Sequence, residues 1–301
     1  MEHPWFVFFG ANALLVITLS YCAMVLVERG LYAVLRPGEY DDSNAVGSFL
    51  TNLLANITAV LIGAVVPLLT YVWVWDTARV FDPGLALWTW FAAFVIHETA
   101  YHFGHWIGHR VGFFWAWHSP HHSSEELNLT TAARGFTFGD PLATLFSLPA
   151  ALLGVHPLVF LTVLFAKNLW GIFNHTRLVK TMGPLDAFMA TPANHRVHHG
   201  RNPHYIDKNY GQVLVLWDKL FGTYQAETEE PDYGLVEPMT SNNPITIHFA
   251  GWVWLWTRMK SAPDAATALK YLWKPPEWHH AGECHGCAKM RGSRVAQDAV
   301  G

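Results

Sequence analysis

Two stretches of the sequence place eight histidines in short, regular groups. Residues 105–122 read HWIGHRVGFFWAWHSPHH, and residues 195–199 read HRVHH. Side chains three or four positions apart share one face of a helix, so each group can direct two imidazoles toward one point. Neutral imidazole is a good ligand for iron, zinc, copper and nickel. The groups contain His105, His109, His118, His121, His122, His195, His198 and His199, and His175 is an isolated ninth. Eight or nine imidazoles outnumber the ligands that one metal ion uses, which favours a two-metal centre.

The overall composition indicates a membrane protein. Of the 301 residues, 51% are hydrophobic and 14% are charged, whereas average soluble domains carry about 25% charged residues. The 19 basic and 23 acidic residues leave a net charge of −4, which excludes a basic nucleic-acid-binding protein. Three cysteines do not make a disulfide framework, so the sequence does not imply an oxidising compartment.

Apolar runs predict about four membrane crossings. The uncharged run 5–27 is long enough to span a bilayer of about 30 Å. It lacks the basic start and small-residue cleavage site of a signal peptide, which favours a retained span. Residues 46–75 predict a second, tilted span, and residues 84–104 predict a third. Between 139 and 173, two shorter apolar stretches around a GVHP turn predict a helical hairpin or two tilted spans.

The charges of the connectors predict the orientation. Six arginines fall on the side of the histidines, whereas the opposite short loop holds Arg79. The positive-inside rule therefore places the histidine-rich side in the cytoplasm. The expected fold is an all-α integral membrane protein with about four transmembrane helices or hairpins and a cytoplasmic, histidine-rich cap that holds the dimetal centre. We expect N-terminal spans at 1–94, a catalytic domain at 95–228 and a cytoplasmic or interfacial tail at 229–301.

The histidine groups also carry a family resemblance. HX3H at 105–109 and HX2HH at 118–122 and at 195–199 resemble, in order and spacing, the three histidine boxes of the fatty acid hydroxylase/sterol desaturase superfamily. The resemblance covers about residues 95–228 and is nearest to ether-lipid-cleaving members. Further stretches that carry it are HHSSEELNLTTAAR at 121–134, NHT at 174–176, HRVHHGRNPHYIDKNYG at 195–211 and WDKLFGT at 217–223.

The resemblance implies an enzyme that uses O2 and two electrons to hydroxylate a lipid C–H bond in an ether lipid, a sterol or a fatty-acyl chain. It implies two iron ions held by the nine histidines named above. The electrons would come from tetrahydrobiopterin, as in the ether-lipid-cleaving members, or from an electron-transfer protein such as cytochrome b5 or a ferredoxin-like donor. Two residues depart from the family pattern, since Glu98 stands where an aspartate is usual and Trp106 where an arginine is usual.

Four polar residues are expected to support the ligands. Glu98 precedes the first box, and Glu125, Asn128 and Arg134 match polar positions after the second box. Ligating histidines need partners for their other ring nitrogen, so these residues are expected to brace ligands or to contact a lipid headgroup. A solvated charged loop is the competing interpretation for Glu125. Asp207, Asp218 and Lys219 are expected to brace the third box.

Other functions compete with lipid hydroxylation. A sterol or fatty-acid desaturase would use the same boxes, and zinc would bind the same imidazoles. A membrane metal transporter should carry its histidines near mid-membrane, whereas these follow the ends of the apolar runs. The CHGC motif at 284–287 could bind zinc or sense redox state, or it could belong to a disordered tail. We expect the lipid chain to reach the metals between the apolar runs 46–75, 84–104 and 139–173.

Overall fold

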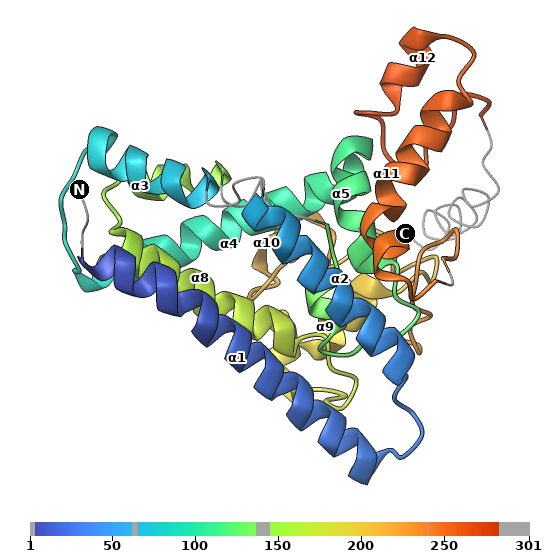
Figure 1. The fold of residues 1–301 in the computed structure, drawn as a ribbon, viewed down its shortest axis with the longest axis horizontal. Coiled ribbons are helices and arrows are strands. Elements are labelled where there is room, and N and C mark those ends of the chain that lie inside the picture. Colours follow the sequence, from blue (N-terminus) through green and yellow to red (C-terminus); the bar gives the residue numbers. More distant parts are fainter. Residues whose placement is uncertain (1–3, 62–65, 137–144, 240, 283–301) are drawn as a thin grey trace.

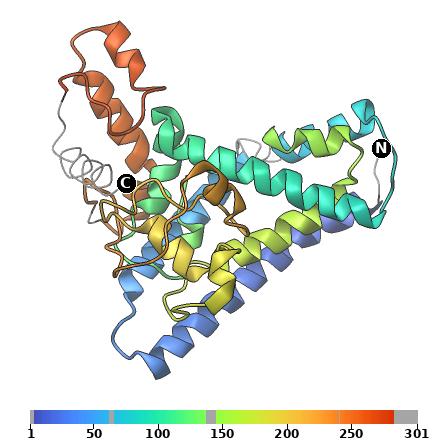
Figure 2. The same ribbon diagram turned by 180° about the vertical axis from the view of Figure 1, so that it is seen from behind.

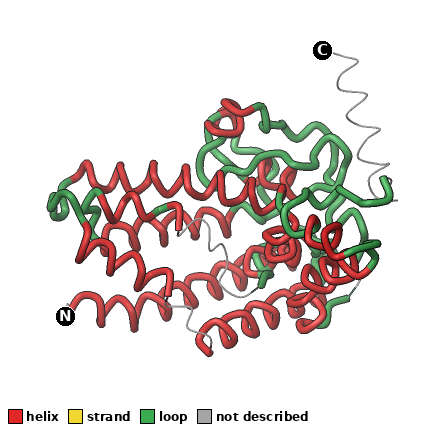
Figure 3. Tube along the Cα trace, turned by 90° about the horizontal axis from the view of Figure 1, so that it is seen from above, coloured by secondary structure: helices red, strands yellow, loops and turns green. Residues whose placement is uncertain are grey.

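The computed structural model describes residues 4–61, 66–136, 145–239 and 241–282. Within these ranges the chain forms helices joined by loops, and no strand occurs, although two isolated β-bridges pair Met189 with Leu214 and Gly200 with Tyr233. The helices of the N-terminal half extend toward one end of the molecule, and the loops gather at the other end (Figure 3). The expected all-α fold is therefore observed. The Cys284–Cys287 motif lies outside the described residues.

Five apolar helices pack against one another at the end of the molecule away from the loops. Helix α1, Pro4–Leu35, runs beside α8, Pro157–Phe173, in both ribbon views (Figures 1 and 2). Helix α4, Leu87–Arg110, packs on α8 and on the short α7, Leu148–Leu152, and α3, Val66–Ala78, packs on α7. Tyr71, Ala93, Val155 and Phe160 form a buried apolar core between these helices. This core anchors the first part of α4, so that its C-terminal end is presented to the loops.

The loop-rich end holds the short elements that carry histidines. Helix α5 spans Gly112–His122 and follows α4 after a sharp turn at Val111. Helix α9 spans Pro192–His199, and a capping box between Thr191 and Asn194 sets where it begins. The remaining short elements are η1 at Thr131–Ala133, η2 at Gly183–Ala187 and α10 at Leu216–Phe221.

Helix α11, Pro244–Lys260, closes the molecule from the C-terminal side. It packs against α5 and against α2, Asp42–Leu61, and the shorter α12, Ala265–Lys270, follows it. Both lie on the side away from α3 (Figure 1). Segment 244–260 was expected in the tail, but it lies directly over α5.

The expected membrane spans are reproduced in part. Among the described residues, one helix is long and apolar enough to cross a membrane, over Leu15–Leu35, and the apolar helix α8 is shorter. The run 46–75, expected as a single tilted span, contains two separate helices, α2 and α3. Pro67 stands in the first turn of α3, where a missing backbone N–H costs nothing, and this favours a new helix start within the run.

Helix α5 and helix α11 approach each other at Gly251. A Cβ atom added at Gly251 would lie 2.0 Å from the carbonyl oxygen of Ala116 and 2.5 Å from Ser119 Oγ. By contrast, a Cβ atom at Gly30 of α1 would meet nothing within 4 Å. Close backbone approach of the two helices therefore requires glycine at 251.

We predict that Gly251→Ala destabilises the protein by about 1–3 kcal/mol, because it overpacks the crossing of α5 and α11. Thermal unfolding in detergent, followed by tryptophan fluorescence, measures the effect. Gly30→Ala is the matched control and should leave the unfolding temperature unchanged or slightly raised. Equal unfolding temperatures for the two variants would contradict this account of the crossing.

Candidate metal centre

The three histidine boxes and His175 meet at the loop-rich end of the molecule. His105 and His109 lie on the last turns of α4, the second box ends α5, the third box ends α9, and His175 follows α8. Their ring nitrogens form two sets, each with all its ligand atoms within 4.8 Å of one another. One set holds His105, His109, His118, His122 and His198, and the other holds His121, His175, His195 and His199.

Two of the boxes divide their histidines between the sets. His121 and His122 are neighbours on α5, and neighbours on a helix point about 100° apart, so His122 joins the first set and His121 joins the second. The third box divides in the same way, because His198 belongs to the first set while His195 and His199 belong to the second. The two sets are therefore adjacent, and the rings of His122 and His199 stack with centroids 4.4 Å apart.

Backbone carbonyl groups hold the Nδ1 side of several rings. His105 Nδ1 donates to the carbonyl oxygen of Tyr210 at 2.9 Å, and His198 Nδ1 donates to that of Lys208 at 2.9 Å. In the second set, His121 donates to Arg134 at 3.2 Å and His175 donates to Gly171 at 2.8 Å. Since a carbonyl oxygen only accepts, these four rings carry their proton on Nδ1, and their Nε2 atoms present lone pairs.

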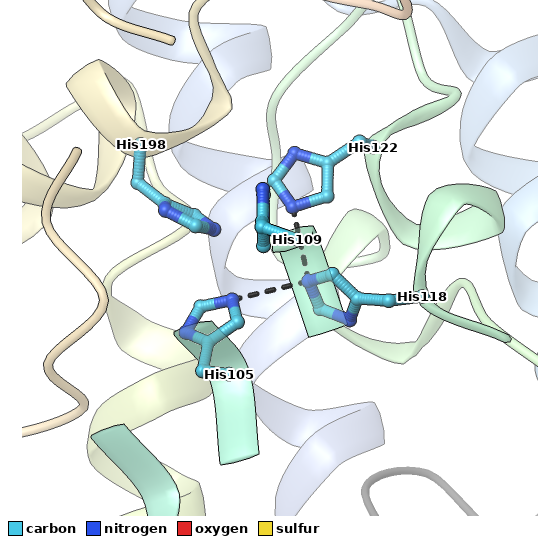
Figure 4. Close-up of side chains that lie close together, drawn as sticks. All are labelled: His105, His109, His118, His122 and His198. Atoms are coloured by element: carbon cyan, nitrogen blue, oxygen red, sulfur yellow. Dashed lines mark hydrogen bonds between the residues drawn. The ribbon is translucent and has the colours of Figure 1, made fainter. Parts of the chain in front are cut away.

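The lone pairs face one another inside each set. His121 Nε2 and His175 Nε2 lie 3.2 Å apart, although both rings hold their proton on the far side. In the first set, Figure 4 shows His105 and His122 directed at His118, with Nε2 to Nε2 distances of 3.1 Å. Within the described part of the chain, the buried Nε2 atoms of His109 and His198 have no hydrogen-bond partner. Such an arrangement fits a cation in each set.

Burial favours the neutral form of four of these rings. It lowers the pKa of His118, His122 and His199 well below the usual value of 6.5, and neighbouring imidazoles lower the pKa further. Burial also lowers the pKa of His121 to about 4. The neutral form is the one that ligates a metal ion, so the site is prepared for ligation at neutral pH.

Two aspartates brace the first set. Asp218, fully buried, accepts hydrogen bonds from the backbone N–H groups of Tyr210 at 2.8 Å and Gly211 at 2.9 Å, which fixes the carbonyl group that His105 uses. Asp207 pairs with Arg110 and lies 3.7 Å from His109 Nδ1. These two residues and Lys219 were expected to brace the third box. The contacts of the two aspartates lead instead to His105 and His109 of the first box, and Lys219 Nζ donates to the carbonyl oxygen of Ala187.

Glu98 braces the loop that follows Tyr210. One of its oxygens accepts from the backbone N–H groups of Val213 at 2.9 Å and Leu214 at 2.8 Å, and the other lies 2.8 Å from Lys167 Nζ. Both charged side chains are almost fully buried. Lys167 was not singled out from the sequence, although a lone charge within an apolar run is itself a signal of function or pairing.

The three polar residues of the second-box stretch have different surroundings. Arg134 is buried, holds His121 through its carbonyl oxygen, and donates from Nε to Ser123 Oγ at 3.0 Å. Asn128 is buried and accepts from the backbone N–H of Thr130 within its own turn. Glu125 is 44% exposed and lies 3.8 Å from Arg201. None of the three lines the cavity described next.

A cavity of about 1060 Å³ opens onto the metal-facing histidines. His109, His122, His198 and His199 line one part of it, and residues of α11 line another part. This cavity is lined by α5, α9, α11 and the loops around them, and not by the apolar runs that the sequence suggested. Two of those runs line a separate, smaller cavity of about 260 Å³, between residues 95–103 of α4 and residues 146–149.

We predict that Glu98→Gln destabilises the protein by about 3–5 kcal/mol, because it leaves the buried Lys167 without a counter-charge. The double variant Glu98→Gln/Lys167→Met should recover a large part of this loss. Thermal unfolding in detergent checks both variants. If the double variant were no more stable than the single one, the unpaired lysine would not be the cause.

Known proteins are similar to this chain over the region that contains the nine histidines. The fatty acid hydroxylase family profile matches residues 90–223. Alkylglycerol monooxygenase of Homo sapiens is 34% identical over 265 residues, which cover 87% of this chain and 59% of that protein. The Caenorhabditis elegans protein of the same name is 38% identical over 216 residues, or 70% of this chain and 43% of that one.

A bacterial relative is also similar. Ornithine lipid hydroxylase of Rhizobium tropici is 35% identical over 132 residues, covering 43% of this chain and 40% of that protein. No solved structure matched the chain. The chain spans about half the length of the alkylglycerol monooxygenases it matches. The region that matches the fatty acid hydroxylase family profile contains all nine histidines.

Proposed function

We propose that this protein is a membrane-bound dimetal oxygenase that hydroxylates a C–H bond of a lipid. One atom of O2 would enter the lipid as a hydroxyl group, and the other would leave as water after uptake of two electrons and two protons. The observation that carries the proposal is the pair of lone-pair clusters, above all the Nε2 atoms of His121 and His175 at 3.2 Å, beside a large cavity. The named relatives are lipid monooxygenases and hydroxylases, which supports the same activity.

The nine histidines are the proposed ligands. Five nitrogens in one set and four in the other suit two ions, and the proposed ions are iron. Iron in these sets would supply activation of O2, with electrons from tetrahydrobiopterin or from an electron-transfer protein. An all-imidazole site brings little negative charge, unlike the carboxylate-rich sites of soluble di-iron proteins. Glu98, Asp207, Asp218 and the carbonyl group of Arg134 would hold the rings in place.

The protein's own part in the reaction would be orientation and exclusion of water. The part of the cavity that α11 lines carries Ile245, Phe249 and Val253, four residues apart along the helix. An apolar chain lying on this stripe would face His122, His198 and His199 across the cavity. Holding one carbon near the site selects the bond that reacts, and such orientation contributes several kcal/mol in favourable cases.

The protein would be anchored in the membrane through more than one helix, with the histidines on the cytoplasmic side. Helix α1 supplies one apolar segment of spanning length, and α8 lies beside it. The arginine bias of the connectors supports the orientation. We propose residues 95–228 as the catalytic domain, residues 1–94 as membrane anchor, and residues 229–301 as an interfacial segment of which α11 completes the cavity.

We predict that His198→Ala and His121→Ala each lower the bound metal from roughly two ions per chain to roughly one, because each removes a ligand from a different set. Elemental analysis of the purified protein measures the ratio. His156→Ala is the control, since that ring caps α8 and belongs to neither set, and it should keep both ions. Metal lost from the control and retained in both other variants would refute the assignment.

We predict that turnover of a lipid under ¹⁸O2 places one labelled oxygen atom in the product. A hydroxylated ether carbon would collapse to an aldehyde that carries the label. Mass spectrometry of lipid extracts detects either product. A new double bond with all label in water would identify a desaturase, and transport of metal across vesicles without O2 uptake would identify a transporter. His198→Ala protein serves as the inactive control.

A further inference from the structure

The wall that α11 contributes to the cavity changes character along its length. Cavity-lining residues on this helix run from Ile245 to Arg258, followed by Ser261. At a rise of about 1.5 Å per residue, the stretch from 245 to 261 spans roughly 24 Å. Its first part is apolar, with Ile245, Phe249 and Val253, and its last part is polar. The cavity thus offers an apolar stripe that leads to a charged end.

The charged end contains an ion pair that faces the cavity. Arg258 of α11 donates to Glu237, which belongs to the loop across the cavity, and both residues line it. The arginine side chain is 16% exposed and the glutamate side chain is 55% exposed. Glu277 and His279 also line the cavity, and Glu277 lies 3.6 Å from Arg110. This end therefore reaches solvent on the side of Glu237.

The charges at this end discriminate between headgroups. The charged residues that line the cavity are paired: Arg258 with Glu237, Arg201 with Asp232, and Asp207 and Glu277 with Arg110. An anionic headgroup that took Arg258 would leave Glu237 without its partner. A neutral headgroup would have to compete with the ion pair for hydrogen bonds. A headgroup with one charge of each sign can replace both partners at once, so that no charge is left unpaired.

We propose that this charged end binds the headgroup of a zwitterionic lipid, with Arg258 at its anionic group and Glu237 at its cationic group. The apolar stripe of α11 then holds the chain against the metal-facing histidines. This inference rests on the proposed function, because the lipid bound here is the one that would be hydroxylated. It adds the class of substrate and the two residues that select it.

Binding without turnover tests the proposal. The full-length, metal-loaded protein is kept free of reductant, and the probes are lipids with one identical chain and different headgroups: phosphocholine, phosphate, glycerol and trimethylammonium. Quenching of tryptophan fluorescence reports occupancy, because Trp115 and Trp254 line the cavity. We expect the phosphocholine lipid to bind about tenfold more tightly than the phosphate lipid, a difference of ~1.4 kcal/mol.

Charge variants assign the two residues. Glu237→Gln should weaken binding of the phosphocholine and trimethylammonium lipids and leave the phosphate lipid bound equally or better. Arg258→Gln should weaken binding of the phosphocholine and phosphate lipids. Glu230→Gln is the matched control, because this exposed glutamate does not line the cavity, and it should change none of the affinities.

Val253→Trp reports on the chain. It should reduce binding of every long-chain lipid and spare short-chain lipids with the same headgroup. Equal affinity for all headgroups, a preference for phosphate, or the same losses in Glu237→Gln and Glu230→Gln would overturn the proposal. Selective binding of the phosphocholine lipid without oxygen incorporation on addition of a reductant would retain it and contradict the proposed function instead.

Discussion

The structure depends on the need to bury many imidazole lone pairs beside one another. Each neutral ring that donates from Nδ1 to a carbonyl oxygen turns an unprotonated Nε2 toward other unprotonated nitrogens. Without a cation, these buried lone pairs would be unsatisfied, which costs free energy. The surrounding loops must therefore hold the rings firmly. Two non-glycine residues with positive φ, Asp207 and Asn209, flank Lys208, whose carbonyl group holds His198. The strained backbone of these two residues therefore lies beside the carbonyl group that positions the His198 ring.

A second layer of buried charge holds that loop in register. Asp218 fixes the backbone at Tyr210 and Gly211, and Glu98 fixes it at Val213 and Leu214. Because Glu98 and Lys167 come from α4 and α8, the loop is tied to the same two helices that lead into His105 and His175. The apolar helix layer and the histidine-rich end are thus joined by ionic and hydrogen-bonded contacts at buried positions. A polar connection of this kind favours one register of the loop over its alternatives.

Much of the site could be predicted from the sequence, because ligand spacing is local. Histidines three or four residues apart within a box lie on the same face of a helix, and the structure brings all nine histidines together. The division of the sets could not be predicted in this way, since it depends on how α5 and α9 are rotated relative to α4. Arg134 illustrates another limit. It was singled out for its charged side chain, but its backbone carbonyl group is what contacts His121. Any residue type supplies a backbone carbonyl group, so the sequence does not reveal such a contact.

The fold could be predicted less completely, for a physical reason. An apolar run indicates that its side chains are removed from water, and either lipid or a protein core can surround them. The apolar character of the run 46–75 therefore did not distinguish one span from two helices, α2 and α3, of which α2 packs against α11. Pro67 was the one local signal of a second helix start. Segment 244–260 shows the converse case. It was expected only as part of a cytoplasmic or interfacial tail, and in the structure it forms a helix that packs on α5, lines the cavity and exposes Trp256. An amphipathic helix beside a lipid-sized cavity can belong to the active site and to the membrane surface at once, which is the position from which a membrane lipid could be taken up.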